Sequence, residues 1–297
     1  MIETILQQIS YIPLPVRWFA RQAHLGVHKS RQRGTGLEFD QIVEYRDGET
    51  IQKINWAATA RRGGDIPFVN RYYEDKALTL MLLVDMSASM DFGSARLTKK
   101  SLAAEIAASL VYSALVGHDR VGLLGFVAGM VCYVPPRQCQ AYQRVIPERI
   151  LTCEAAQAAA SFPAAVTALE RLVKRRSLVF VLSDFITEDV AAMEQALRRL
   201  CRLHDVIALV LTDPLEVSHP AGTARLRTRD LETGQLRSYR LTQRNQQQMA
   251  LRDLHRRSQL HGVFQHLRVS HLTVTPHSNY CEDLRHLLLT RQRRASA

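Results

Sequence analysis

The sequence predicts an α/β protein with a doubly wound, mostly parallel sheet, helices on both faces and an N-terminal β-rich extension. Two observations support this fold class. Short, nearly continuous apolar runs recur from residue 78 onward, and stretches with apolar residues at three- and four-residue spacing separate them. Runs of the first kind are typical of strands buried on both faces of a parallel sheet. Their alternation with helices favours right-handed crossovers.

The chain is expected to have two domains. Residues 1–76 form an N-terminal helical and β-rich extension or small subdomain. Its first residues carry a weak helical pattern that ends at Pro13 and Pro15, because proline interrupts a helix. Residues 31–76 are rich in glycine and arginine and contain short extended pieces. The second domain covers residues 77–297.

The second domain supplies the strands and helices of the predicted sheet. Four apolar runs are expected to be its core strands, at residues 78–85, 120–127, 177–184 and 205–213. Helices with apolar periodicity are expected at residues 98–116, 163–175, 189–203 and 243–260. Residues 130–136 follow the second strand after Ala128-Gly129, so a hairpin makes them an antiparallel edge strand. Residues 271–276 add a final strand.

The composition is that of a globular protein, with 46% hydrophobic and 23% charged residues among 297. No apolar run approaches the ~18 residues that a membrane-spanning helix needs. The N-terminus lacks the basic segment and apolar core of a signal peptide. Five cysteines, an odd number without a C-x-x-C pair, indicate free thiols in a reducing compartment. We therefore expect a cytoplasmic protein without a membrane span.

The formal net charge of +11 is unevenly distributed. Residues 222–297 contain 14 arginines and no lysine against five acids, a net charge of +9. A surplus of this size attracts an acidic partner or a nucleic acid. Because no aromatic-interleaved RNA motif or helix-turn-helix pattern accompanies it, a solvated basic surface is the favoured interpretation. Nucleic-acid binding stays open as an alternative.

Three of the predicted core strands end in an aspartate, namely Asp85, Asp184 and Asp213. Ligands of such sheets bind at the carboxyl ends of the strands, where three acids repel one another unless a cation or donors offset the charge. In the segment DMSAS, alternation places Ser87 and Ser89 on the same side as Asp85. Mg²⁺ prefers such oxygen ligands and retains waters, which leaves a position for a partner's carboxylate. The alternative is that either serine caps the following helix.

Several longer segments occur in a characteristic order and spacing. They are GLEFDQIVEYRDGETIQKINWAATARRG, LVDMSASMDFG, GHDRVGLLGF, RRSLVFVLSDF and LHDVIALVLTDPLE with a trailing RDLETGQ. Together they resemble a known family, the bacterial "domain of unknown function 58" proteins, from about residue 34 to residue 291. The resemblance implies that residues 77–297 are similar to a von Willebrand factor A domain and carry its metal-ion-dependent adhesion site.

In a site of this kind two serines and a threonine contact the cation, and two aspartates act mostly through water. Carried over to this sequence, the two serines are Ser87 and Ser89, and the two aspartates are Asp85 and Asp184. The threonine has no direct counterpart, because Ala160 stands at its place, with Ser161 beside it. We expect Ser161 to supply the missing hydroxyl and the cation to be Mg²⁺, or else Mn²⁺ or Ca²⁺. The alternative is a degenerate site in a metal-independent scaffold.

The resemblance implies a binding module and not an enzyme. Family members of this type are commonly encoded beside MoxR-type AAA+ ATPases, which implies an adaptor or co-chaperone of such an ATPase or its client. The enzymatic alternative is a phosphatase-like hydrolase with Asp85 as its nucleophile. Such enzymes need a second acid two residues later, where this sequence has Ser87. The sequence also lacks a phosphate-binding G-x-x-x-x-G-K-[ST] loop and a G-x-S-x-G nucleophile motif.

Overall fold

In the computed structural model, the chain forms two compact units. One consists of Met1–Val16 with Leu78–Ala297, and the other of Arg17–Ala77. The described residues are 2–14, 38–45, 51–63, 66–73, 77–93, 97–153, 160–187, 189–217, 225–229, 236–240 and 243–296. Pro15 and much of the Gly- and Arg-rich stretch therefore lie outside the described residues.

The N-terminal helix α1 (Ile2–Gln7) belongs with the larger unit. The N–H of Ser10 donates to Ser109 Oγ at 3.3 Å, and the N–H of Ile12 donates to Ser113 Oγ at 2.8 Å. From the sequence, these residues are predicted to belong to the N-terminal extension. Contacts with partners about a hundred positions away leave no local pattern in the sequence.

The smaller unit contains an antiparallel pair, β1 (Glu38–Glu44) and β2 (Phe68–Tyr73), as the predicted β-rich extension requires. The 3₁₀ turn η1 (Ile51–Lys53) and the helix α3 (Trp56–Arg61) lie between them in sequence. Thr59 of α3 is buried and its Oγ1 accepts the N–H of Phe68 at 3.0 Å. The helix is thereby fastened to the start of β2.

The larger unit is built on a six-stranded sheet with the order β10-β7-β6-β3-β4-β5. Its strands are β3 (Thr79–Asp85), β4 (Arg120–Phe126), β5 (Met130–Arg137), β6 (Leu178–Ser183), β7 (Asp205–Leu211) and β10 (Ser270–Val274). β5 pairs antiparallel with β4 at one edge, and the other neighbouring strands pair in parallel. The predicted doubly wound, mostly parallel sheet with its antiparallel edge strand is confirmed.

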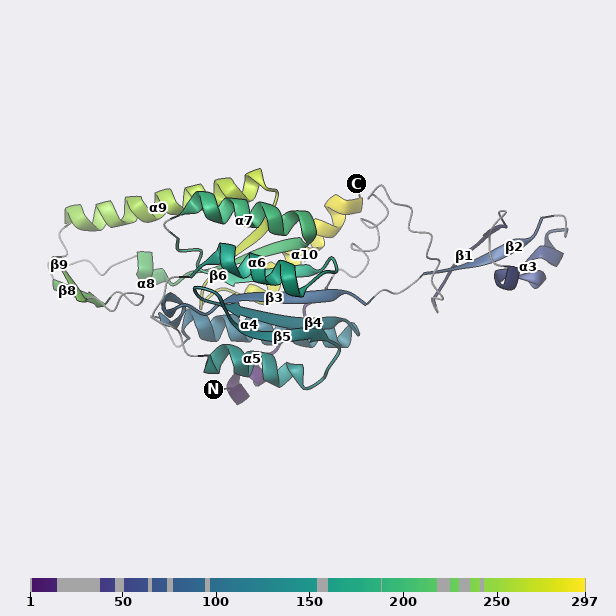
Figure 1. The fold of residues 1–297 in the computed structure, drawn as a ribbon, viewed down its shortest axis with the longest axis horizontal. Coiled ribbons are helices and arrows are strands. Elements are labelled where there is room, and N and C mark those ends of the chain that lie inside the picture. Colours follow the sequence, from purple (N-terminus) through teal and green to yellow (C-terminus); the bar gives the residue numbers. More distant parts are fainter. Residues whose placement is uncertain are drawn as a thin grey trace. The chain divides into compact units, whose positions relative to one another are not determined.

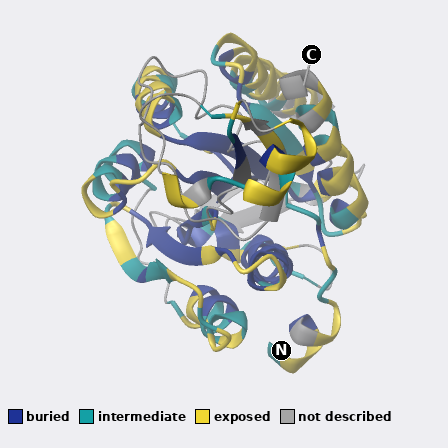
Figure 2. Cartoon of the chain, turned by 90° about the vertical axis from the view of Figure 1, so that its right-hand side faces the viewer, coloured by how far each residue is buried: buried dark blue, intermediate teal, exposed yellow. Residues whose placement is uncertain are grey.

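Helices cover both faces of this sheet (Figure 1). α6 (Phe162–Leu172), α7 (Val190–Leu203) and α9 (Gln243–His266) lie on one face, and their apolar side chains share a core with the strands. α4 (Lys99–Val116) lies on the other face with α5 (Tyr142–Thr152) beside it. Figure 2 shows the buried strands between helices whose outer surfaces are exposed. The core strands are apolar on both sides for this reason.

Some elements of the larger unit are not predicted from the sequence. They are α5, α10 (Tyr280–Ser296) and a hairpin of β8 (Arg225–Arg229) and β9 (Leu236–Arg240). Pro147 lies inside α5, and an internal proline argues against a helix when the sequence alone is considered. The two hairpin strands have five residues each, which is short for a periodic signal.

Gly122 in β4 lies where a side chain has no room. A Cβ atom there would come within 2.8 Å of both Met81 Sδ and the Val134 carbonyl oxygen, and within 2.9 Å of Pro136 N. Two of these atoms are backbone of β5, so they cannot move without disturbing the strand pairing. We expect Gly122→Ala to lower the free energy of unfolding by about 2 kcal/mol in urea denaturation. Gly129→Ala, whose Cβ meets nothing within 4 Å, is the control, and equal losses in both variants would contradict the explanation.

Candidate metal centre

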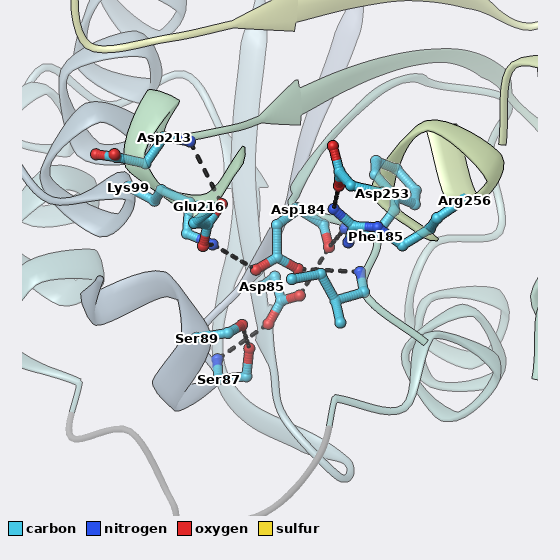
Figure 3. Close-up of polar contacts among 12 residues, drawn as sticks. Asp85, Ser87, Ser89, Lys99, Asp184, Phe185, Asp213, Glu216, Asp253 and Arg256 are labelled. Carbon is cyan, nitrogen blue, oxygen red and sulfur yellow. Dashed lines mark hydrogen bonds and ion pairs between the residues drawn. The ribbon is translucent and has the colours of Figure 1, made fainter. Parts of the chain in front are cut away.

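The three aspartates meet at one edge of the sheet. β7, β6 and β3 are parallel neighbours, so their carboxyl ends lie side by side. Asp85 ends β3, Asp184 directly follows β6, and Asp213 comes two residues after β7. All three are buried. Figure 3 shows them with Ser87 and Ser89 at this edge, which we call the rim.

Asp85 is fixed from two sides. Its Oδ1 accepts the N–H of Ser87 at 2.9 Å, and its Oδ2 accepts the hydroxyl of Ser183 at 2.7 Å. Burial and, to a smaller extent, the negative charge of Asp184 raise the pKa of Asp85 to about 6, although the hydrogen bonds from Ser183 and Ser87 oppose the rise. The carboxylate therefore lies in a place that favours an additional positive charge.

The two serines of the DMSAS segment lie side by side. Ser87 precedes the 3₁₀-helix η2 (Ala88–Asp91) with an extended backbone, and its side chain makes no capping hydrogen bond. Its Oγ instead lies 3.0 Å from Ser89 Oγ. The helix that follows, α4, is capped by Thr98, whose side chain accepts the N–H of Ser101. The capping alternative for Ser87 is thus wrong.

The loop after β6 has a left-handed residue at Phe185. The φ angle of Phe185 is 51°, a conformation that a bulky side chain rarely adopts. Its N–H donates to Ser183 Oγ at 2.9 Å, and the next N–H, that of Ile186, donates to Asp184 Oδ1 at 3.1 Å. The turn therefore orients both Asp184 and the serine that supports Asp85. Strained residues of this kind occur where the surroundings hold them in place for a function.

Sequence reasoning missed Lys99 and the role of Glu216. The Lys99 side chain is fully buried, and its Nζ donates to Asp184 Oδ2 at 2.8 Å and to Glu216 Oε1 at 2.6 Å. Glu216 lies in α8 (Pro214–Val217), and its N–H donates to the Asp213 carbonyl in the turn that the Asp-Pro pair predicts. A lysine at the first residue of a helix opposes the helix dipole, but the neighbouring Lys100 carries the same signal, so the sequence does not single out Lys99.

Residues 41–259 match the family described as "Protein of unknown function DUF58". The chain belongs to this family. The assignment made from the sequence motifs is thereby confirmed. Uncharacterized proteins of Mycobacterium tuberculosis (strain ATCC 25618 / H37Rv) and Mycobacterium bovis (strain ATCC BAA-935 / AF2122/97) are each 31% identical over 217 residues, which are 72% of this chain and 67% of the relative.

Solved structures similar to this DUF58 protein include the conserved hypothetical protein BatB from Bacteroides thetaiotaomicron. The TM-score is 0.48 at 14% identity, over 73% of this chain and 100% of the other. An aerotolerance-related membrane protein from Bacteroides fragilis has a TM-score of 0.47 at 16% identity, over 72% of this chain and 100% of the other. The SpRpn10 VWA domain has a TM-score of 0.41 at 12% identity, over 70% of this chain and 94% of the other. The fold class itself is established by the strand order and pairing of the sheet.

Ser161 and Thr167 are the two hydroxyl residues near the place where the family resemblance expects a threonine. Ser161 stands at the N-cap of α6 without a capping hydrogen bond from its side chain, and its N–H donates to the Val127 carbonyl at 2.7 Å. Thr167 Oγ1 donates to the Pro163 carbonyl and accepts from Arg199 of α7. Thr167 is therefore engaged away from the rim, while the Ser161 hydroxyl is not used for capping.

Several arginines of the basic C-terminal third support the fold. Arg291 pairs with Asp205 at 2.5 Å, and Arg285 donates to the carbonyl of Tyr11 at 3.0 Å. In α9, Arg256 pairs with Asp253 at 2.8 Å (Figure 3). Intramolecular partners therefore account for part of the positive charge of this region.

The described ranges contain neither a cluster of metal-binding side chains nor a helix suited to crossing a membrane. No group of three or more His, Cys, Asp or Glu side chains there could hold a metal ion, so a cation at the rim depends on serine hydroxyls as well as carboxylates. The five cysteines are free thiols, as predicted. Among the helices of the described ranges, none combines the length and apolarity that crossing a bilayer requires.

Proposed function

We propose that this DUF58 protein is a protein-interaction module that binds an acidic group of its partner through a divalent cation at the rim. The observation that carries the proposal is the pair of hydroxyls of Ser87 and Ser89, 3.0 Å apart beside the buried carboxylate of Asp85. Adjacent ligands of an octahedral Mg²⁺, at about 2.1 Å from the metal, are separated by about 3.0 Å. The two hydroxyls thus fit one edge of such an octahedron.

The charges of the rim also fit a divalent ion. Four carboxylates of the rim, those of Asp85, Asp184, Asp213 and Glu216, are accompanied by the ammonium of Lys99. A Mg²⁺, Mn²⁺ or Ca²⁺ ion would offset most of the negative charge that remains. When bound, the ion supplies a Lewis-acid position that accepts a carboxylate oxygen.

In this proposal the side chains of the rim have different roles in binding the ion. Ser87 and Ser89 would contact the ion, Asp85 and Asp184 would act through water, and Ser161 would add the remaining hydroxyl. A hydrolase with Asp85 as its nucleophile has less support, because both carboxylate oxygens accept hydrogen bonds within the protein.

Metal titration tests the site directly. We expect Mg²⁺ to bind the wild-type chain in isothermal titration calorimetry, and Ser87→Ala to weaken binding at least ~tenfold. Ser161→Thr should strengthen it, because it restores the hydroxyl residue that the family site uses. Thr167→Ala removes a hydroxyl of α6 that is engaged outside the rim and serves as control. Equal affinities in wild type and Ser87→Ala would refute the proposed site.

The partner we propose is a MoxR-type AAA+ ATPase or its client, with this chain as adaptor or co-chaperone in the cytoplasm. The family resemblance supports this choice of partner. A purified ATPase of this type should be retained by the immobilised chain in Mg²⁺ and released by EDTA. Retention that is unchanged in EDTA would show that the contact does not use the ion.

A further inference from the structure

Lys99 lies in an unfavourable place for a lysine. It is the first residue of α4, where the positive end of the helix dipole repels a cation. Its side chain has no exposure to solvent, and transferring an ammonium out of water is unfavourable unless carboxylates compensate it. Asp184 and Glu216 provide this compensation, at 2.8 Å and 2.6 Å.

These contacts join three separate segments of the rim. Lys99 follows the DMSAS segment, Asp184 lies in the loop after β6, and Glu216 lies in α8 after β7. The two partners are 85 and 117 positions away from Lys99 in the chain. Figure 3 shows the Lys99 side chain directed toward both carboxylates. The ammonium therefore holds together loops that would otherwise bring like charges close to each other.

The neighbouring Lys100 provides a contrast within the same helical turn. Its Nζ donates to the carbonyl of Cys153 and lies 3.4 Å from the half-exposed carboxylate of Asp91. Pairing with the rim carboxylates is thus a property of Lys99, and not of the two consecutive lysines together.

We propose that the Lys99 ammonium is a built-in cation that occupies the Asp184–Glu216 half of the rim and confines a divalent ion to the side of Asp85, Ser87 and Ser89, from which Asp184 is reached only through water. The first part follows from the contacts above, and the second rests on the proposed function. The rim then stays assembled in the absence of a divalent ion. The ammonium also lowers the affinity of the rim for such an ion, because it repels the ion and engages Asp184.

The test measures Mg²⁺ affinity by calorimetry and melting temperature in EDTA and in Mg²⁺. Lys99→Met should bind Mg²⁺ at least ~tenfold more tightly than wild type and should melt at a lower temperature in EDTA, with the loss reversed by Mg²⁺. Lys99→Met/Glu216→Gln removes one charge of each sign, so tighter binding by this variant reports the release of Asp184 and not a change in net charge. Lys100→Met is the matched control and should retain the wild-type affinity.

The outcomes separate this inference from the proposed function. If wild type binds no Mg²⁺ while Lys99→Met does, the proposed function fails and the built-in cation is supported. If both Lys99 variants retain the wild-type affinity, or if neither binds Mg²⁺, the inference is overturned. If both Lys99 variants are unfolded in EDTA, Mg²⁺ is added to them. Recovery of the folded state then supports the inference, and a lack of recovery overturns it.

Discussion

Replacing Phe185 with alanine is expected to lower the free energy of unfolding by about 4 kcal/mol. The ring is buried and packs against Phe162 of α6 at 6.0 Å and Phe264 of α9 at 5.4 Å between centroids. Its removal leaves a cavity between these helices and the sheet. Chemical denaturation monitored by circular dichroism measures the loss, and Phe185→Leu, which keeps most of the apolar volume, should lose much less.

Phe185→Gly separates the backbone contribution from the packing contribution. Both small variants lack the ring, but glycine adopts the φ of 51° without the strain that alanine experiences in the left-handed region. We therefore expect Phe185→Gly to be more stable than Phe185→Ala by about 1 kcal/mol, the reverse of the usual order in helices and strands. The usual order at this position would show that the left-handed turn is not retained in solution.

The stability of the metal-free protein is expected to fall by about 3 kcal/mol between about pH 3 and about pH 7 because of Asp85. The pKa of its carboxyl is about 6 in the folded chain, against an ordinary value of 3.8. Each tenfold change in proton affinity is worth about 1.4 kcal/mol. Below pH 3.8 the group is protonated in both states and its contribution is complete. As the pH rises to 6 the unfolded chain loses the proton first, so the contribution is lost.

Asp85→Asn provides the comparison, because its side chain does not ionise. Urea denaturation of both proteins in EDTA, from about pH 3 to about pH 8, should give a difference in unfolding free energy that grows in favour of the variant up to about pH 7 and is constant above it. Titrating groups that do not interact with Asp85 affect both proteins equally and cancel in the difference. Parallel stability curves would show that Asp85 is not perturbed as described.

The strands of the core were predictable because their signal is local. The apolar runs around β3, β4, β6 and β7 reflect burial on both faces, and the short turn after Val127 indicates the antiparallel edge strand β5. α5 was not predictable from its own residues, since Pro147 lies inside it. Its place in the fold depends on contacts with α4, which a local pattern does not contain.

The candidate site likewise contains some residues that the sequence indicates and others that only the folded structure reveals. Asp85 and Asp184 are recognisable in the sequence because each stands at the end of a strand signal, and parallel strands bring their carboxyl ends to one edge of a sheet. Ser87 and Ser89 are recognisable because they follow Asp85 at alternate positions. The Lys99–Asp184–Glu216 cluster is different. Lys99 and Glu216 are polar residues at the start of a helix and in a short turn, where solvent exposure is the ordinary expectation.

They meet because the strand order β7-β6-β3 places three loops together. The surrounding core excludes water from the ammonium, and the two carboxylates then replace its hydration. Hydrophobic periodicity is a property of neighbouring residues and can be recognised in the chain itself. Compensation of a buried charge depends on distant partners and emerges only in the folded protein.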